Sequence, residues 1–197
     1  MPETHAVKAR RARDRLSAAE AASLVRPRKP NLFAFADDGE TPNNPRCPLI
    51  LYRSPVRLPE DADPAAVFET LFAANGWKDS WRDGIYPYAH FHSHIHEALG
   101  VARGSAVVQF GGEKGRRIAV KAGDVVVLPA GVGHEGLEQS RDLLIVGAYP
   151  AVGRYDEHRP GELAHAAAVR NVAATPVPAA DPVYGARGPL PALWGAG

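Results

Sequence analysis

The sequence predicts an all-β domain of the sandwich or barrel class, and two observations support this prediction. Short runs of β-branched and aliphatic residues follow one another through the middle of the chain, and glycines separate them. The runs cover residues 105–110, 116–121, 124–128 and 143–149. Short strands divided by glycine turns are typical of sandwiches and barrels. Hydrophobic residues make up 45% of the 197-residue chain, so a core can be buried without disulfide bridges.

Residues 1–60 are expected to form an N-terminal extension. A short helix is predicted near residues 17–25, where a serine is followed three positions later by a glutamate, as in a capping box. Residues 31–48 are rich in Pro, Asn, Asp and Gly, which predicts a loop. The apolar run 49–53 then predicts a first strand.

A second helix is predicted where apolar residues recur at helical spacing. Asp63 can cap its first turn, in which Pro64 is well tolerated, and the pair Asn75-Gly76 ends it. This helix should lay one apolar stripe on the β-domain. The stripe consists of Val67, Phe68, Leu71 and Phe72.

These patterns divide the chain into three parts. After the extension, we expect residues 61–150 to form the β-barrel together with its preceding helix. Residues 151–197 are rich in Ala and Pro and show little periodicity. We expect this C-terminal extension to pack on the barrel or on a partner subunit, with a flexible tail as the alternative.

Charge and cysteine content exclude several classes of partner. The net charge is +1, so neither nucleic acid nor a membrane surface is expected as a partner. Basic residues gather in residues 8–29, where a solvated, partly helical extension is favoured over a nucleic-acid arm or a targeting segment. No apolar stretch is long enough for a membrane helix or a secretory signal. The single cysteine, Cys47, cannot form an internal disulfide, which favours a reducing, cytoplasmic location. Its thiol is interpreted as structural or incidental.

Five of the eight histidines fall in two short segments, and the first of these begins at His90. Residues two apart on a strand face the same side, so His90 and His92 should project together. This spacing suits two imidazole nitrogens on one metal ion. Glu97 has the opposite parity, so a turn must intervene if its carboxylate is to join them.

The second segment leads to His134. A strand is expected to rise from a turn at Gly123 and to end at Pro129, because proline cannot donate to a β-ladder. Gly131 and Gly133 permit a tight bend. His134 then begins a new strand, and its side chain points inward if the bend reverses the chain.

The two segments resemble the two conserved motifs of cupins. The first motif is matched at each fixed position from its first histidine onward, by His90, His92, Glu97 and Gly104. The second is matched by Gly123, Pro129, Gly131 and His134. That motif usually carries an asparagine four residues after its histidine, and this chain has Glu138 there instead.

More narrowly, the chain is similar to the YjlB-like cupin family. The matching pieces are residues 90–100, 103–105, 147–150 and 181–185, with Gly188-Pro-Leu and Trp194. The resemblance implies a double-stranded β-helix, a small jelly roll with a metal inside. It also implies one divalent transition metal (Fe, Mn, Ni, Co or Zn). The implied ligands are His90, His92, Glu97 and His134.

Two further histidines lie between the expected ligands. His96 directly precedes Glu97, so it faces away on a regular strand. We expect it behind a ligand or in the pocket wall, and it is the leading candidate for a catalytic proton-transfer group. His94 is expected in solvent, and a role as an extra ligand remains the alternative for both.

Several other residues near the motifs have a functional and a structural interpretation. Tyr86, Tyr88 and Phe91 are expected in the core or at the barrel rim rather than in a pocket. Arg103 could bind a substrate carboxylate or lie at an exposed strand end. Gln109 is a weaker candidate for the barrel interior.

The favoured function is a mononuclear metal-dependent enzyme acting on a small organic substrate. A dioxygenase is expected with iron, and an isomerase or lyase with zinc, manganese or nickel. The alternative is a cupin that binds or senses a small ligand without turnover. Cupins often pair through edge strands, and both extensions exceed what a minimal barrel needs, so a homodimer is expected.

Overall fold

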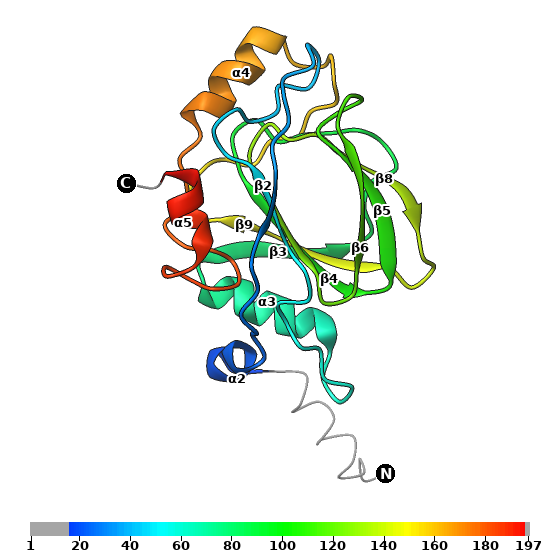
Figure 1. Ribbon diagram of the computed structural model, residues 1–197, viewed down its shortest axis with the longest axis vertical. Coiled ribbons are helices and arrows are strands. Elements are labelled where there is room, and N and C mark those ends of the chain that lie inside the picture. The colour runs from blue at the N-terminus through cyan, green and yellow to red at the C-terminus, as the bar shows by residue number, and fades with distance from the viewer. Residues whose placement is uncertain (1–15, 196–197) are drawn as a thin grey trace, which may run out of the picture.

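The computed structural model describes residues 16–195, and its helices lie on the outside of a β-roll (Figure 1). The helices are α2 (Ala18–Ser23), α3 (Pro64–Ala74), α4 (His165–Ala174) and α5 (Pro189–Trp194). The strands are β1 (Asn31–Phe33), β2 (Leu49–Tyr52), β3 (Trp77–Asp83), β4 (Glu97–Arg103), β5 (Ser105–Phe110), β6 (Arg116–Lys121), β7 (Val125–Leu128), β8 (His134–Gln139) and β9 (Leu144–Pro150).

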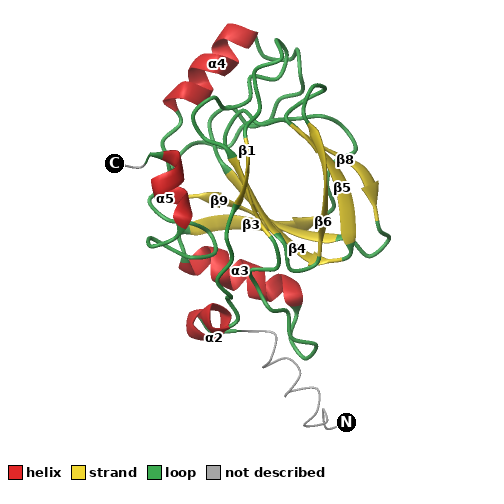
Figure 2. Ribbon diagram, in the orientation of Figure 1, coloured by secondary structure: helices red, strands yellow, loops and turns green. Residues whose placement is uncertain are grey.

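The strands form two antiparallel sheets (Figure 2). The larger has the order β1-β2-β7-β4-β9-β3, and the smaller has the order β6-β5-β8. Distant strands are therefore neighbours, since β4 lies between β7 and β9. Apolar side chains from both sheets form one core between them, which includes Leu99, Val108, Ile118 and Leu128. The fold is a double-stranded β-helix, and the all-β prediction is confirmed.

Most of the predicted strands are present within one residue of the expected bounds. Residues 105–110 and 116–121 coincide with β5 and β6, and β2, β7 and β9 also lie where strands were expected. Strand β3 was not expected. Its sequence is mostly polar, and its pairing with β9 shifts register between Lys78 and Trp81. Asp79 has a φ of 50° there, which breaks the alternation of side chains that marks a strand in sequence.

The N-terminal segment supplies part of the larger sheet. Strand β2 pairs with β7, and all four of its residues are buried. The shorter β1 pairs with β2 at the edge of the same sheet. The expected division at residue 60 therefore does not separate an extension from the roll, because a strand buried on both faces belongs to the core. Residues 8–15 of the basic run lie outside the described residues.

Both predicted N-terminal helices are present with the expected caps. In α2, the Ser17 hydroxyl accepts from the Glu20 backbone at 3.2 Å, and the Glu20 carboxylate accepts from the Ser17 backbone at 2.7 Å. In α3, Asp63 accepts from the Ala65 backbone at 3.1 Å. The helix ends at Ala74 with Asn75 as its C-cap, where the pair Asn75-Gly76 predicted a stop.

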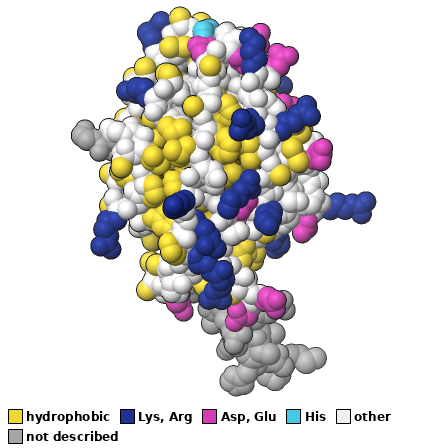
Figure 3. All heavy atoms as spheres, viewed as in Figure 1, with side chains coloured by type: hydrophobic (Ala, Val, Ile, Leu, Met, Phe, Trp, Pro, Cys, Tyr) yellow, Lys and Arg dark blue, Asp and Glu magenta, His cyan; other side chains and the backbone are white. Residues whose placement is uncertain are grey.

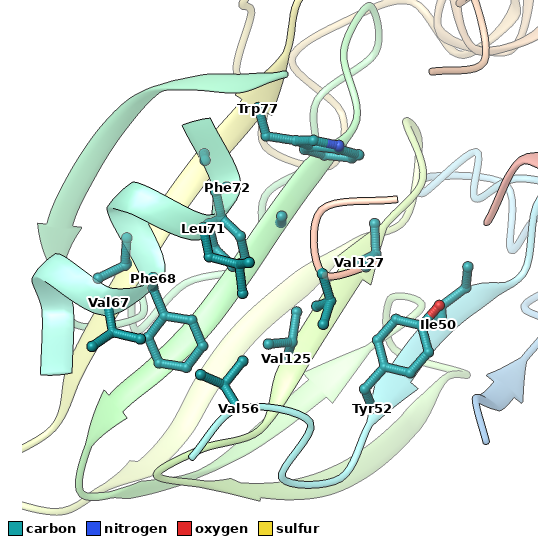
Figure 4. Close-up of a cluster of buried hydrophobic side chains, with 14 of the residues drawn as sticks. Ile50, Tyr52, Val56, Val67, Phe68, Leu71, Phe72, Trp77, Val125 and Val127 are labelled. Atoms are coloured by element: carbon teal, nitrogen blue, oxygen red, sulfur yellow. The ribbon is translucent and has the colours of Figure 1, made fainter. Parts of the chain in front are cut away.

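Helix α3 covers the outer face of the larger sheet (Figure 4). Its Phe68 and Phe72 join Val125 and Val127 of β7 in one buried cluster. The helix lies close to β4 at Gly100, where an added Cβ would be 2.6 Å from the Phe68 ring. Glycine therefore permits this close approach of helix and sheet.

The alternation of side chains along β4 decides which residues face the barrel interior. Leu99 and Val101 belong to the core between the sheets, whereas Ala98 and Ala102 belong to the cluster under α3. By the same alternation, Glu97 faces the interior and its neighbour His96 faces outward.

The C-terminal segment packs on the roll. Leu190 and Trp194 of α5 are buried in the same cluster as α3. The Trp194 indole donates to the Pro48 carbonyl at 2.9 Å, and the Tyr52 hydroxyl donates to the buried Asp181 carboxylate. These contacts join residues more than a hundred positions apart and cover the outer face of the larger sheet.

The surface shows basic, acidic and apolar side chains side by side on the face drawn in Figure 3. Arg26, Arg28 and Lys29 are exposed. Cys47 is buried and free, and burial raises the pKa of its thiol. Among the described helices, none combines the length and the apolar character that a membrane crossing requires.

Candidate metal centre

Three buried imidazoles come together from two distant segments. His90 and His92 lie before β4, and His134 opens β8. The backbones of His90 and His134 pair as an isolated bridge, with N–O distances of 3.2 and 2.9 Å. Each ring offers one nitrogen, and these three atoms lie within 4.8 Å of one another. The structure thus brings the two motifs to one point.

Each imidazole is oriented by a backbone carbonyl. In all three rings, Nδ1 lies within hydrogen-bonding distance of a carbonyl oxygen. The pairs are His90 with Tyr88 at 3.2 Å, His92 with Asp156, and His134 with Val132 at 3.3 Å. A carbonyl can only accept, so Nδ1 carries the proton and Nε2 keeps its lone pair. This is the tautomer that metal-binding histidines use.

Glu97, the first residue of β4, lies beside this group of three histidines. Its Oε2 lies 3.4 Å from the Nε2 of His92 and 3.4 Å from the Nε2 of His134. An irregular stretch separates His92 from β4, which supplies the turn that the parity of the sequence required. Glu97 is 2% exposed, and its Oε2 has no hydrogen-bond partner.

The four side chains fit a divalent transition metal. A buried carboxylate oxygen without a partner is costly, and native proteins rarely leave one unexplained. A cation between this oxygen and the neighbouring Nε2 atoms would satisfy it. Three neutral imidazoles and one carboxylate suit Mn, Fe, Co, Ni or Zn, and such a set leaves coordination positions for a substrate.

The charges at this site support an ionised Glu97 carboxylate beside a neutral His90 ring. Burial and the neighbouring His134 lower the pKa of His90 to about 3. Burial opposes ionisation of Glu97, but the neighbouring His92 and His134 rings hold the Glu97 pKa well below its usual range. Burial also opposes protonation of His92, yet the Glu97 charge raises the His92 pKa to about 9. A metal bound at Nε2 would take the place of any proton there, because the ligand form of imidazole is neutral.

A cavity of about 290 Å³ opens beside these residues. His90, His92, Glu97 and His134 all line it. Most of the remaining wall is aromatic or aliphatic, and the aromatic residues are Trp81, Tyr86, Tyr149 and Tyr155. A concave, mainly apolar site with a few convergent polar groups is typical of small-molecule binding.

Two of these aromatic residues are fixed against each other on the barrel wall. The Trp81 indole donates to the Tyr149 hydroxyl at 3.0 Å. The ring of Trp81 occupies the space where a side chain at Gly147 would lie. Neither aromatic residue was predicted to line the site. Tyr149 shares the parity of Ile145 in β9, which faces the core, and this signal could have placed it inside.

The structure does not bring His96 to the cavity. Its Nδ1 accepts from the Ala130 backbone at 2.9 Å, and its Nε2 lies 3.1 Å from the Pro176 carbonyl. Its ring packs on Trp194 with centroids 4.8 Å apart. Both ring nitrogens are used on the outer face of the sheet, so this position does not support the expected proton-transfer role, which stays a prediction.

His94 belongs to a polar cluster centred on Asp156. The Asp156 carboxylate accepts from the backbone of Ser93 at 2.9 Å and of His94 at 3.0 Å. It also contacts the His94 imidazole at 2.9 Å and the His158 imidazole at 3.0 Å. His94 is thus partly exposed but paired, rather than free in solvent. Asp156, whose carbonyl orients His92, was not identified from the sequence.

The remaining candidates are distributed as follows. Phe91 is buried, as expected, whereas Tyr86 lines the cavity and was expected only in the core or at the rim. Arg103 is exposed at the end of β4, and Glu138 is exposed on β8. The Gln109 amide donates to the Gly112 carbonyl at 2.8 Å and does not line this cavity.

Comparison with known proteins gives one clear relative. No protein-family profile matches the chain. The chain is 40% identical over 167 residues to the uncharacterized protein YjlB of Bacillus subtilis (strain 168), covering 85% of this chain and 98% of the relative.

Solved structures give more distant matches. One is acireductone dioxygenase from Bacillus anthracis with a cadmium ion (16% identity, 50% of this chain and 71% of that chain, TM-score 0.34). Another is a conserved protein with a double-stranded β-helix domain from Klebsiella pneumoniae (13% identity, 82% and 100%, TM-score 0.34).

Proposed function

The chain belongs to the YjlB-like family of cupins, and we propose that it binds one divalent transition metal and uses it to transform a small organic substrate. One observation carries this proposal. Three imidazoles with carbonyl-bound Nδ1 atoms and a buried carboxylate without a hydrogen-bond partner face one point on the wall of a cavity.

The ligands in this proposal are His90, His92, Glu97 and His134, and the metal is Fe, Mn, Ni, Co or Zn. The bound ion would supply Lewis-acid polarisation of a substrate oxygen or, as iron, redox chemistry with O₂. The reaction class is therefore a dioxygenase, an isomerase or a lyase.

The chain's own residues would bind and orient the substrate. The aromatic wall excludes water and offers apolar contact to a carbon skeleton. Burial and the Glu97 charge raise the pKa of Tyr149, so its hydroxyl stays protonated near neutral pH. That hydroxyl accepts from the Trp81 indole and interacts with the Glu97 carboxylate, which places it beside the proposed ligands on the inner wall of the cavity.

The metal is tested by elemental analysis of the purified native protein and of the variant His134→Ala. We expect near-stoichiometric metal in the native protein and loss of metal in the variant, with an unchanged circular dichroism spectrum because the β-roll closes its own core. His165→Ala is the matched control, since His165 lies on α4 and pairs with Asp37 at 2.8 Å. A variant that retains full metal content would contradict the ligand assignment.

Turnover separates an enzyme from a binding protein. The metal-loaded protein would be assayed with each candidate metal for oxygen uptake and for product formation from panels of small organic compounds. The alternative is a cupin that binds or senses a ligand without catalysis. Saturable ligand binding without turnover across all metals and compound classes would favour that alternative.

We also infer a cytoplasmic homodimer. The support is that β1, β3, β6 and β8 are edge strands, which often mediate pairing between subunits. A monomeric mass in light scattering at micromolar concentration would contradict the dimer. Fractionation of the producing cells tests the location.

A further inference from the structure

The charged groups around the cavity indicate what kind of ligand it can hold. Arg82 is the one basic residue, apart from the histidines, among the described residues that line it. Its Nε and Nη2 each donate to the Glu69 carboxylate at 2.7 Å, and its Nη1 donates to Asp63 at 2.8 Å. The guanidinium is therefore fully engaged by two carboxylates. Among the described residues of this wall, no free arginine or lysine is therefore available to pair with a substrate carboxylate or phosphate.

The acidic groups on the same wall are differently placed. Glu157 lines the cavity, and its carboxylate accepts from the Tyr155 hydroxyl at 3.0 Å. Its charge is the largest cause of the raised pKa of Tyr86. Burial, followed by the hydrogen bond and charge of Glu157, raises the pKa of Tyr155 to about 12. Glu157 thus imposes a negative potential on two tyrosines of the cavity.

These tyrosines are at the mouth of the cavity. Tyr155 is 55% exposed and Tyr86 is 42% exposed, although both line it. Tyr155 packs edge-on against Tyr149 with centroids 5.3 Å apart, which connects the mouth to the inner wall. Aromatic faces beside a carboxylate form the usual binding site for an ammonium group.

The same aromatic cluster already binds a cation of the chain itself. The Arg159 guanidinium lies 4.0 Å from the ring centre of Tyr88. Tyr88 stacks on Tyr86 at 4.9 Å but does not line the cavity. The internal cation is therefore placed on the ring outside the wall, and Tyr86 and Tyr155 remain accessible to a ligand.

We propose that the cavity takes a small organic cation, with its ammonium group held by Tyr86, Tyr155 and Glu157 at the mouth. An oxygen at the other end of the ligand would point to His90, His92, Glu97 and His134. Only this second contact rests on the proposed function, because the ammonium contacts involve no metal.

A matched pair of ligands tests the charge. Choline and 3,3-dimethylbutan-1-ol have nearly the same shape and differ in the positive charge. Titration calorimetry of the full-length protein would measure both, with zinc loaded and after chelation. Because two exposed rings and one carboxylate would contribute, we expect choline to bind about tenfold more tightly than the alcohol in both states.

Variants at the mouth test the residues. Glu157→Gln and Tyr155→Leu should each weaken choline binding about three- to tenfold and leave binding of the alcohol nearly unchanged. Tyr155→Phe keeps the ring and should keep most of the affinity. Glu138→Gln is the matched charge control, because Glu138 is exposed on β8 and does not line the cavity.

Results of two kinds would overturn the inference, the first from the ligand pair and the second from the variants. One is binding of the neutral alcohol that equals or exceeds that of choline, or no binding of either ligand. The other is equal loss of choline binding in Glu138→Gln and Glu157→Gln. Because the cation preference is also measured without metal, it can fail while the metal assignment stands, and the reverse also holds.

Discussion

The two faces of the larger sheet each bury polar side chains, but they satisfy them differently. His96 and Glu97 are adjacent in sequence and both nearly inaccessible, at 1% and 2% exposure. His96 faces outward, where both its ring nitrogens have backbone partners. Glu97 faces the interior, where its Oε2 has only the nearby imidazole nitrogens and no hydrogen-bond partner.

The outer face repeats this complete pairing at Asp181. Its carboxylate accepts from the Tyr52 hydroxyl and from the backbone of Val183 at 2.8 Å and Tyr184 at 3.1 Å. Burial nevertheless raises the pKa of Asp181. On the outer face, His96 and Asp181 thus form their hydrogen bonds with other protein atoms. This is typical of buried polar residues with a structural role.

The difference teaches that burial alone does not distinguish a structural polar residue from a candidate ligand. What distinguishes them is whether each buried polar atom has a hydrogen-bond partner within the protein. On the inner face, the protein orients the Nδ1 atoms and leaves the Nε2 atoms and Glu97 Oε2 facing one another. Preorganised lone pairs without partners are suited to a cation. The predictions below separate the two faces by measuring metal affinity and stability in parallel.

The largest effect on metal affinity is expected for Glu97→Gln. This change removes the one anionic donor, so metal affinity should fall by more than the roughly 100-fold that loss of a ligand-orienting residue costs. Competition with a chromogenic chelator would measure it. Glu138→Gln is the control on an exposed strand position. Unchanged affinity in Glu97→Gln would remove Glu97 from the ligand set.

The converse result is expected for His96→Ala. Metal affinity should be retained, while the free energy of unfolding falls by about 2–4 kcal/mol. The cause is a cavity beside Trp194 and two backbone groups, of Ala130 and Pro176, without partners. Urea denaturation of the metal-free protein would measure it. His96→Asn, which can still accept from Ala130, should recover part of the loss. Metal loss in His96→Ala would mean that the two faces are not independent.

A smaller loss of metal affinity, about 10- to 100-fold, is expected for Asp156→Ala. Asp156 fixes the backbone of Ser93 and His94 next to His92, whose imidazole donates to the Asp156 carbonyl. The same chelator competition would measure it, with the exposed Asp142→Ala as control. Equal affinities in the two variants would show that the carbonyl alone orients His92.

The smallest effect is expected for Tyr52→Phe on the outer face, where the change acts on the free energy of unfolding. This change removes one hydrogen bond to the buried Asp181 and should cost about 1–2 kcal/mol of unfolding free energy, with metal content unchanged. Tyr184→Phe is the comparison, since its hydroxyl donates to the Arg26 carbonyl at 2.9 Å near the surface and should cost less. Both are measured by urea denaturation, and the reverse order would count against the buried pair as a stabilising contact.

Much of the fold could be predicted from local patterns. The capping box of α2, the apolar stripe of α3 and the alternating strands β5 and β6 each follow from spacing along the chain. Strand β3 could not be predicted, because its few apolar residues are separated by a register shift and its pairing with β9 is set by distant residues. The same applies to β1, which is only three residues long.

The candidate ligands could be identified because their spacing is local within each of two motifs. The cavity wall could not, since Trp81, Tyr149 and Tyr155 come from separate segments that meet only when the sheets pack. Asp156 was missed for the same reason, because its contact with Ser93 spans 63 positions of the chain.

The sequence alone determined which side chains could donate to a metal and on which side of a strand each would lie, because alternation is a local property of extended backbone. Only the tertiary structure decided that His96 is satisfied and Glu97 is not. That outcome depends on which backbone groups the C-terminal segment and the second sheet bring to each face. The partners of a buried polar atom come from distant parts of the chain. For this reason, which residues are candidate ligands and which are structural also depends on distant parts of the chain.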